Sequence, residues 1–267
     1  MSMGARQRRD DIVLLAHTSG LTSVEELSAR FDVTASTIRR DLARLTGEGK
    51  IARTYGGAMA LTGNGGESTF RQRNQEAAAA KRAMARLART LVHDGESILL
   101  DAGSSVAALA TELQHDISLT VATTSLAVLE ELAEVDAIHV ECLGGTLRHP
   151  SQGFVGPLAE AALERMTFDR VFLGADGVAV DSICEADLQQ TRLKEMMCRQ
   201  AHEVVVLADA SKLGAAPFHA WAKLPERWTL VTDDSATEEQ LEPFYLAGVD
   251  VAVATVKPLV QATPESG

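Results

Sequence analysis

The apolar positions near the start of the chain recur at helical spacing. Ile38, Leu42 and Leu45 stand at i, i+4 and i+7 and form a single apolar stripe. Thr34 precedes this stripe, and its hydroxyl can accept a hydrogen bond from a free amide of a first helical turn. A helix is therefore predicted to begin at Thr34. Shorter stripes predict two earlier helices, over residues 6–16 and 23–31.

A very short connection joins the second and third of these helices, which is the arrangement of a helix-turn-helix. Residues 51–55 then form a short extended run, and Gly56 and Gly57 follow it as a turn. A run and a turn in this place predict the hairpin wing of a winged helix.

A segment rich in glycine and small polar residues comes next. Residues 59–69 have no periodicity typical of a helix or a strand. We predict a linker there, with Phe70 and Arg73 docking its far end. The predicted division of the chain is a first domain over residues 1–58, a linker over 59–73 and a second domain over 74–267.

The pattern of the second domain is an alternation of helical segments with short, uninterrupted apolar runs. Such runs predict buried strands in a mainly parallel sheet that helices cover on both faces, which is an α/β fold. An alanine-rich helix over residues 77–92 comes first, and its basic face is interpreted as solvated surface. That face carries Lys81, Arg82, Arg86 and Arg89. The predicted strands are residues 97–100, 119–122, 138–143, 170–173, 204–207, 229–231 and 251–253.

Charge is distributed unevenly between the two domains. The net charge of the 267 residues is −12, yet residues 1–58 hold nine Lys and Arg against seven Asp and Glu, a balance of +2. The remainder therefore carries −14. Because salt confines electrostatic fields to about 10 Å, a cationic first domain on an acidic body is compatible with nucleic-acid binding.

Several classes of protein and site are not indicated. No window approaches the roughly 18 apolar residues of a membrane span, and the N-terminus has no apolar run that could act as a signal peptide. A cytoplasmic protein is expected. Cys142, Cys184 and Cys198 are widely separated, so neither a disulfide framework nor a zinc site is predicted. No histidine pair at metal-ligand spacing occurs, and no metal or cofactor is expected.

The outward face of the helix after Thr34 has the chemistry of a DNA-reading surface. Small hydroxyls lie near its start and guanidinium groups along its turns, and both kinds of group reach base edges and phosphates in a DNA groove. An ordinary solvated basic face is the alternative, and the helix alone does not separate the two. The side chains on this face are Ser36, Thr37, Arg39, Arg40 and Arg44.

The ends of five predicted strands carry hydroxyls, glycines or charges. In an open α/β sheet, ligands bind outside the carboxyl ends of the strands, often at helix N-termini. Each group alone is more often a helix cap, but five consecutive strand ends together suggest a binding site for a phosphate and for sugar hydroxyls. In chain order they are Asp101, Gly103, Ser104 and Ser105; Thr124 and Ser125; Gly144, Gly145 and Arg148; Asp176; and Asp209 and Lys212.

Two runs carry a specific resemblance. Val33 to Leu42 is Val-Thr-Ala-Ser-Thr-Ile-Arg-Arg-Asp-Leu, and Gly49 to Ala58 is Gly-Lys-Ile-Ala-Arg-Thr-Tyr-Gly-Gly-Ala. On these runs, residues 6–58 resemble the DNA-binding domain of the DeoR family of bacterial transcriptional regulators. The residues predicted to contact operator DNA are Thr34, Ser36, Thr37, Arg39, Arg40, Arg44, Lys50 and Arg53, of which Lys50 and Arg53 lie in the wing.

The second domain, from residue 74 to about 256, resembles the DeoR-type sensor domain. The markers are Asp101-x-Gly-Ser-Ser, Gly144-Gly145, Val155-Gly-Pro, Phe172 to Gly177, Glu185 to Met197 with Lys194, and Asp209-x-Ser-Lys212. That domain is similar in fold to ribose-5-phosphate isomerase A and glucosamine-6-phosphate deaminase. The resemblance implies a phosphorylated sugar as effector, and it adds Glu185 and Lys194 to the predicted effector site.

This chain departs from the family pattern at three places. Gly103-Ser104-Ser105 stands where Gly-Thr-Thr is frequent, and the hydroxyls needed for phosphate binding are kept. Thr124-Ser125 replaces Thr-Asn, and Ser182-Ile183-Cys184 replaces Gly-Leu-Thr. The last two changes bear on which sugar is accepted.

Two functions from different classes remain to be weighed: an effector-controlled repressor of carbohydrate genes, and a sugar-phosphate isomerase with an accessory DNA-binding head. An isomerase needs a carboxylate base and a lysine beside the sugar. The similar isomerases carry Asp-Gly-Ala-Asp-Glu and a Lys-Gly-Gly-Gly-Gly loop. Here Leu173 to Gly177 lacks the first Asp and the Glu, and the glycine loop is absent. We therefore predict a repressor and not an enzyme, acting as a homo-oligomer, a dimer or a tetramer, since one winged helix buries little DNA surface.

Overall fold

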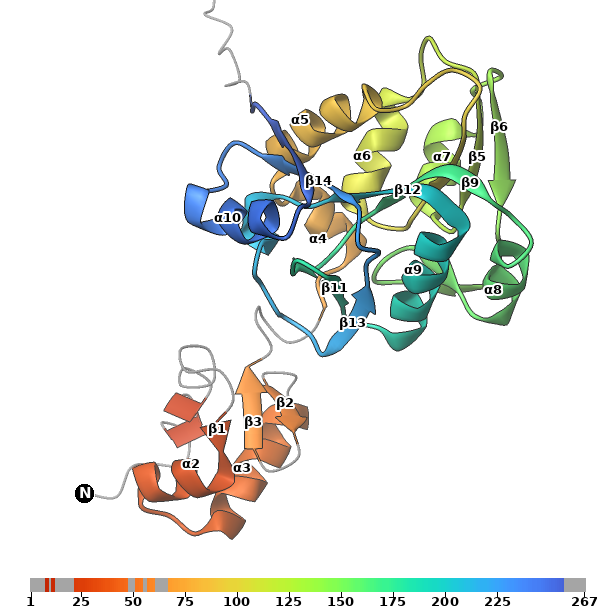
Figure 1. Cartoon of the computed structure of the whole chain (residues 1–267). Helices are drawn as coiled ribbons and strands as arrows, with labels where there is room; N and C mark the ends of the chain where they lie inside the picture. Colours follow the sequence, from red (N-terminus) through yellow and green to blue (C-terminus); the bar gives the residue numbers. More distant parts are fainter. Residues whose placement is uncertain are drawn as a thin grey trace, which may run out of the picture. The chain divides into compact units, whose positions relative to one another are not determined.

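The structure is a computed structural model that describes residues 8–9, 11–12, 22–47, 51–54, 57–60 and 67–256. The chain divides into two compact units, Met1–Ser68 and Thr69–Gly267 (Figure 1). Among the described residues, no helix combines the length and the apolar character needed to cross a membrane.

The N-terminal unit contains the predicted helix-turn-helix and hairpin. Helix α2 spans Val24–Phe31 and α3 spans Ala35–Gly47. Strands β2 (Ile51–Thr54) and β3 (Gly57–Ala60) pair antiparallel, and β3 also pairs with the short β1 (Thr22–Ser23). Of the helix predicted over 6–16, the four described residues are helical, and the rest lie outside the described residues.

The apolar stripe of α3 forms the core of this unit. Ile38, Leu42 and Leu45 are buried together with residues of the first two helices, as their spacing predicts. The Thr34 hydroxyl accepts a hydrogen bond from the Thr37 amide at 3.3 Å, so the predicted N-cap is also present. Asp41 is buried and pairs with Arg8 at 2.7 Å, which ties the first helix to α3.

The second unit is built on a seven-stranded sheet in which all neighbouring strands are parallel. The strand order is β15-β14-β12-β9-β4-β5-β6, and every strand overlaps one of the seven predicted runs. The strands are β4 (Ser97–Leu100), β5 (Leu119–Thr123), β6 (Ile138–Cys142), β9 (Phe168–Leu173), β12 (Ala201–Leu207), β14 (Thr229–Asp233) and β15 (Asp250–Ala254).

Helices cover both faces of this sheet, as Figure 1 shows. Side chains of α5, α6 and α7 form one apolar cluster with the sheet, and those of α8, α9 and α10 form the other. The helices are α5 (Ala78–Arg89), α6 (Ser104–Glu112), α7 (Leu126–Leu132), α8 (Pro157–Leu163), α9 (Leu188–Gln200) and α10 (Glu238–Leu246). The α/β fold with a mainly parallel sheet is confirmed.

Shorter elements escaped the sequence analysis, because strands of two to four residues leave almost no periodicity. A hairpin of β7 (Thr146–Arg148) and β8 (Gly153–Val155) follows β6. A small antiparallel sheet has the order β10-β11-β13. Its strands are β10 (Gly177–Val178), β11 (Ser182–Glu185) and β13 (Ala220–Lys223).

The range 59–73 is not a continuous linker. Strand β3 continues through Ala60, and helix α4 spans Phe70–Gln75. The Thr69 hydroxyl accepts a hydrogen bond from the Gln72 amide at 3.3 Å, and Gln72 in turn accepts one from the Thr69 amide at 2.9 Å. This capping box explains how six mainly polar residues begin a helix.

Candidate functional site

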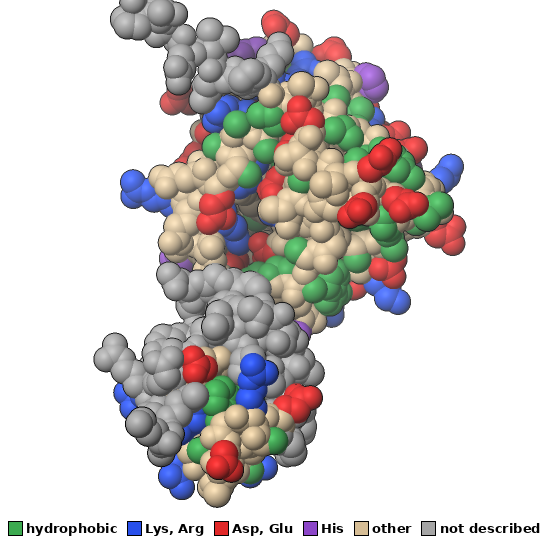
Figure 2. Space-filling model, turned by 90° about the vertical axis from the view of Figure 1, so that its left-hand side faces the viewer, with side chains coloured by type: hydrophobic (Ala, Val, Ile, Leu, Met, Phe, Trp, Pro, Cys, Tyr) green, Lys and Arg blue, Asp and Glu red, His purple; other side chains and the backbone are tan. Residues whose placement is uncertain are grey.

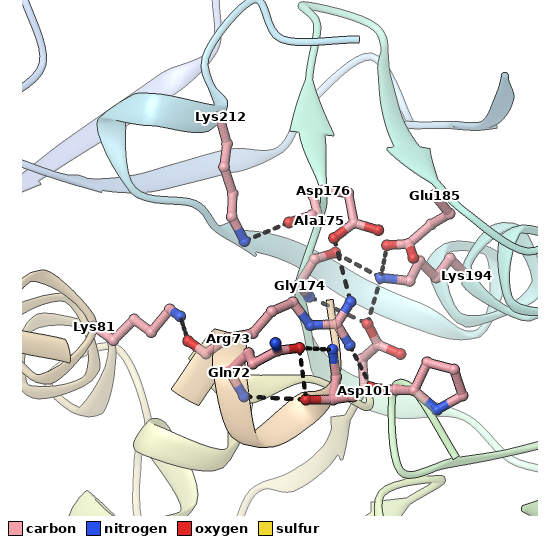
Figure 3. Close-up of polar contacts among 12 residues, drawn as sticks. Gln72, Arg73, Lys81, Asp101, Gly174, Ala175, Asp176, Glu185, Lys194 and Lys212 are labelled. Atoms are coloured by element: carbon pink, nitrogen blue, oxygen red, sulfur yellow. Dashed lines mark hydrogen bonds and ion pairs between the residues drawn. The ribbon is translucent and has the colours of Figure 1, made fainter. Parts of the chain in front are cut away.

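Three charged side chains meet in the interior of the second unit. Lys194 on α9 donates to Asp101 Oδ2 at 2.7 Å, and it also contacts Glu185 Oε1 (Figure 3). Its third contact is the Gly174 carbonyl, at 2.6 Å. The side chain of Lys194 is 1% exposed, and those of Asp101 and Glu185 are 2% and 6% exposed. We call these three residues the buried triad.

The buried triad joins distant segments of the chain. Asp101 directly follows β4, Glu185 ends β11, and Lys194 lies within α9, which begins after the N-cap Asp187. Asp101 Oδ2 also accepts from the Gly174 amide at 3.2 Å, so the same oxygen fixes the end of β9. The triad therefore links the ends of three strands to one helix.

Burial acts in opposite ways on the triad's charges. Burial raises the pKa of Glu185 to about 7, although Lys194 beside it opposes the change. For Lys194, burial alone would lower the pKa, but Asp101 and Glu185 outweigh it and raise the pKa above its ordinary value. Asp101 and Glu185 therefore favour the charged form of Lys194.

The raised pKa of Glu185 predicts a pH dependence. The folded state binds this proton more tightly than the unfolded chain, so ionisation of Glu185 lowers stability as the pH rises from 4.5, its ordinary pKa, to about 7. The variant Glu185→Gln lacks this effect. We expect the stability of the wild type relative to that variant to fall between about pH 5 and pH 7 in urea unfolding series. A Glu164→Gln control at an exposed position should track the wild type, and parallel profiles for all three proteins would contradict the prediction.

A pocket opens beside the triad, at the carboxyl ends of β4 and β9. It has a volume of about 20 Å³, which is room for about one water molecule. Glu185 and Lys194 of the triad form part of its wall. Its lining residues are Arg73, Ala102, Gly103, Ser104, Ser105, Gly174, Ala175, Asp176, Glu185, Gln190, Lys194 and Lys212.

The N-terminus of α6 forms one wall of this pocket. Gly103 is its N-cap with φ 139°, a backbone conformation that favours glycine, and Ser104 and Ser105 are its first two residues. The first amides of a helix have no acceptor within the helix, and the helix dipole places partial positive charge there. This wall therefore suits an anion.

Two cations and two unpaired acceptors complete the pocket. Lys212, at the end of the 3-10 helix η1 (Ala210–Lys212), donates to the Ala175 carbonyl at 2.6 Å. Arg73 lies 3.5 Å from Asp176 Oδ1. Among the described residues, nothing donates to the buried Oδ2 of Asp176 or to the buried Oε1 of Gln190. Because an unpaired buried acceptor is costly, these two oxygens suit the hydroxyl donors of a ligand.

The pocket brings together seven of the effector-binding residues that the sequence predicts. These are Gly103, Ser104, Ser105, Asp176, Glu185, Lys194 and Lys212. Asp101 lies behind the wall, where Lys194 and the Gly174 amide use its Oδ2, although the sequence analysis assigned it to a sugar hydroxyl.

Six other predicted residues do not line this pocket. The hairpin of β7 and β8 covers the end of β5: the Phe154 amide donates to the Thr124 carbonyl at 2.7 Å, and Ser125 caps α7. Gly144 and Gly145 lead into β7, where a Cβ on Gly145 would lie 2.6 Å from the Val155 carbonyl oxygen. The side chains of the remaining two are engaged elsewhere in the sensor: Arg148 lies 3.6 Å from Asp187, and Asp209 caps η1.

The sequence did not indicate that Gln190 and Arg73 line the pocket, and the prediction of a solvated face was wrong for Lys81. Gln190 carries no sequence signal, because a glutamine in the first turn of a helix is commonplace. Arg73 was assigned to the end of the linker, and the capping box at Thr69 was the available signal for α4. Lys81 is not part of a solvated basic face: it is 4% exposed and donates to the Arg73 carbonyl.

The predicted DNA-contacting face of α3 is open to solvent. Ser36, Arg39, Arg40 and Arg44 are exposed, whereas Thr37 is half-buried. The Thr34 hydroxyl is engaged in capping and lies 2.9 Å from that of Ser36. Lys50 lies outside the described residues, and Arg53 is on β2. Basic and acidic side chains both appear on the face of the N-terminal unit in Figure 2.

The winged helix-turn-helix and the α/β domain with an anion-suited pocket define a two-domain, ligand-responsive transcriptional regulator. Residues 8–63 match the DeoR-like helix-turn-helix domain, and residues 76–234 match the DeoR C terminal sensor domain. The chain belongs to the DeoR family. It is a DNA-binding transcriptional regulator.

Similar proteins of known description agree over nearly the whole chain. The HTH-type transcriptional regulator GlpR of Haloferax volcanii is 36% identical over 92% of this chain and 96% of its own length. The putative aga operon transcriptional repressor of Escherichia coli O157:H7 is 30% identical over 93% of each chain. The lactose phosphotransferase system repressor of Staphylococcus aureus is 30% identical over 93% of this chain and 100% of its own. These relatives are regulators, so the isomerase alternative is not supported, and the chain is not an enzyme.

Similarity to solved structures is weaker. Ribose 5-phosphate isomerase A from Methanocaldococcus jannaschii has a TM-score of 0.39 and 22% identity, over 51% of this chain and 55% of that one. A transcriptional regulator from Streptococcus pneumoniae TIGR4 also has a TM-score of 0.39, with 13% identity over 63% of this chain and 87% of that one. At these values the similarity carries nothing about activity.

Proposed function

We propose that this regulator is a cytoplasmic repressor of carbohydrate genes whose DNA binding is modulated by a phosphorylated sugar. The observation that carries the proposal is the pocket at the N-terminus of α6, with Lys212 on its wall and the unpaired oxygens of Asp176 and Gln190 inside it. Free amides and a cation recognise a phosphate, and buried acceptors recognise hydroxyls. The names of the lactose and aga repressors support a carbohydrate system.

In this proposal the ligand has a defined orientation. Its phosphate faces the amides of Ser104 and Ser105 and the Lys212 ammonium. Its hydroxyls donate to Asp176 and Gln190. The buried triad lies beside the pocket and links the strand ends that form it. Of the five strand ends that the sequence suggested, the neighbouring ends of β4, β9 and β12 contribute to this proposed site.

The N-terminal unit is the proposed output. The hydroxyls and guanidinium groups of α3 lie in the major groove, and Lys50 and Arg53 of the wing meet phosphates. We propose a homo-oligomer, a dimer or a tetramer, because a single winged helix buries less DNA surface than specific binding needs. Ligand binding then shifts the population of oligomers competent for the operator.

A thermal-shift screen tests the ligand class. The compounds are inorganic phosphate, glycerol 3-phosphate, ribose 5-phosphate, fructose 1-phosphate, fructose 6-phosphate and glucosamine 6-phosphate, with the unphosphorylated compounds as controls. A true effector at 100 times its Kd should stabilise the protein by about 2.7 kcal/mol. Equal shifts with and without the phosphate would contradict a phosphate-binding pocket.

Lys212→Ala should weaken binding of the stabilising sugar phosphate about tenfold to a hundredfold, since it removes a charge-assisted hydrogen bond. Isothermal titration calorimetry measures this change, and DNA binding without the ligand should be retained. Lys223→Ala is the matched control, because Lys223 is exposed on β13. Unchanged ligand affinity in Lys212→Ala would show that the pocket is misplaced.

A further inference from the structure

Helix α4 is attached to the sensor in an unusual way, because none of its side chains is buried. Burial of an apolar face normally holds a helix in place. Polar contacts help to hold it: the Arg73 guanidinium donates to the Pro150 carbonyl at 3.0 Å and lies 3.5 Å from Asp176, and Lys81 donates to the Arg73 carbonyl. All three contacts involve Arg73, which Figure 3 shows between Lys81 and Asp176.

Arg73 lines the pocket and pairs there with an acidic side chain. Its guanidinium lies 3.5 Å from Asp176 Oδ1, and it lines the same cavity as Ser104, Ser105 and Lys212. A guanidinium fork binds phosphate oxygens as well as carboxylate oxygens. The guanidinium that pairs with Asp176 is thus also suited to bind an anion that enters the pocket.

The pocket must enlarge before a sugar phosphate can enter it. Its volume of about 20 Å³ holds about one water molecule. A second cavity, of about 290 Å³, is lined by Phe70 and Asn74 of α4 together with residues of α5, α6 and α7. Since α4 contributes to the walls of both cavities and none of its side chains is fully buried, a shift of α4 would disturb little of the apolar core.

A shift of α4 would also change the contact between Lys81 and the Arg73 carbonyl. Burial lowers the pKa of Lys81 to about 8, and the positive charge of Lys212 contributes to the decrease. An incoming anion beside Lys212 would favour the charged form of Lys81. The lysine that holds the α4 backbone therefore responds to the charge in the pocket.

We propose that Arg73 binds the phosphate of the effector in exchange for Asp176, and that α4 changes its position as the pocket fills. Thr69, the N-cap of α4, directly follows Ser68, the last residue of the N-terminal unit. In chain order, α4 is the first helix of the second unit. A change in its position would therefore act directly on the segment that leads to the DNA-binding unit. This inference rests on the proposed sugar-phosphate function and assigns that site a further binding residue.

The test compares Arg73→Gln with Arg71→Gln, which alters an exposed arginine on the same helix. The probe is the sugar phosphate that stabilises the wild type most in the thermal-shift screen. Calorimetry should show affinity at least tenfold weaker in Arg73→Gln and unchanged in Arg71→Gln. Arg73→Lys, which keeps the charge, should recover part of the loss. Hydrogen exchange of residues 70–75 should change when the probe is added to the wild-type chain.

Inorganic phosphate separates an exchange of partners from a merely structural role. It has no sugar hydroxyl, so Asp176→Asn removes only the carboxylate that competes for Arg73. Phosphate should bind about tenfold more tightly to Asp176→Asn than to the wild type, and this gain should largely disappear in the double variant with Arg73→Gln. An equal gain in both backgrounds would reflect charge removal alone and overturn the exchange.

Separate outcomes test the role of Arg73 and the proposed sugar-phosphate function. If the wild type binds a sugar phosphate and Arg73→Gln binds it equally well, the role of Arg73 is wrong and the proposed function stands. If no phosphorylated compound stabilises the wild type, both fall. If affinity drops in Arg73→Gln but exchange at residues 70–75 is the same with and without the probe, the movement of α4 is overturned.

Discussion

Replacing Lys194 with methionine is expected to lower the free energy of unfolding of the sensor by about 3–5 kcal/mol, because it leaves buried carboxylates without their cation. Lys194 is 1% exposed and contacts both Asp101 and Glu185. Glu185 can respond by taking up a proton, since burial already raises its pKa. Most of the expected loss of stability then comes from Asp101, which loses its 2.7 Å contact with Lys194. Effector binding should be lost as well, because Lys194 forms part of the pocket wall.

Intrinsic fluorescence in a urea series measures this effect cleanly. The two tryptophans of the chain, Trp221 and Trp228, both lie in the sensor, so fluorescence excited selectively from tryptophan does not report on the N-terminal unit. Lys223→Met is the matched control, with an expected change within about 0.5 kcal/mol for an exposed position. A wild-type unfolding curve for Lys194→Met would show that the triad contributes little to stability.

Replacing Arg40 with alanine is expected to weaken operator binding by about 1–3 kcal/mol, which is roughly 5-fold to 150-fold. Arg40 is exposed on α3, on the face that lies opposite the buried Ile38 and Leu42. Fluorescence anisotropy with an operator fragment measures the affinity, and calorimetry should show that binding of the sugar phosphate is unchanged.

Controls distinguish base reading from a general loss of charge. Arg30→Ala removes an exposed arginine at the end of α2 and should alter affinity little. Arg39 and Arg40 project about 100° apart on the helix, so their variants should differ. If an arginine contacts only phosphate, its removal should weaken binding to all DNA sequences alike and reduce the salt dependence by about one ion. If Arg40→Ala binds the operator as tightly as the wild type, this face of α3 does not read DNA.

Secondary structure that is long or strongly periodic was predictable from the sequence. Ile38, Leu42 and Leu45 form the core of the N-terminal unit because a spacing of three to four residues places side chains on one helical face. The seven mainly apolar runs became the seven strands of the parallel sheet, since its central strands are buried on both faces and are rich in apolar residues. The hairpin of β7 and β8, the small sheet β10-β11-β13 and α4 were not predictable in this way, because two to six residues contain too little periodicity.

The candidate site was only partly predictable. The strand-end rule placed Ser104, Ser105 and Asp176 correctly at one edge of the sheet, because parallel strands all end there. It could not foresee that the hairpin of β7 and β8 would cover Thr124 and Ser125. Which strand ends stay open depends on what packs over them, and that packing comes from segments with weak local signals.

The sequence by itself determined the class of protein, the two domains and the chemistry available to each. Only the tertiary structure decided how that chemistry is combined. It buried Lys81, which a helical wheel places with exposed arginines, and it joined Asp101 and Glu185 on one lysine. It also brought Arg73 to Asp176 across more than a hundred residues of chain. Such contacts arise from the packing of whole elements, whereas sequence periodicity reports only on which face of its own element a residue lies.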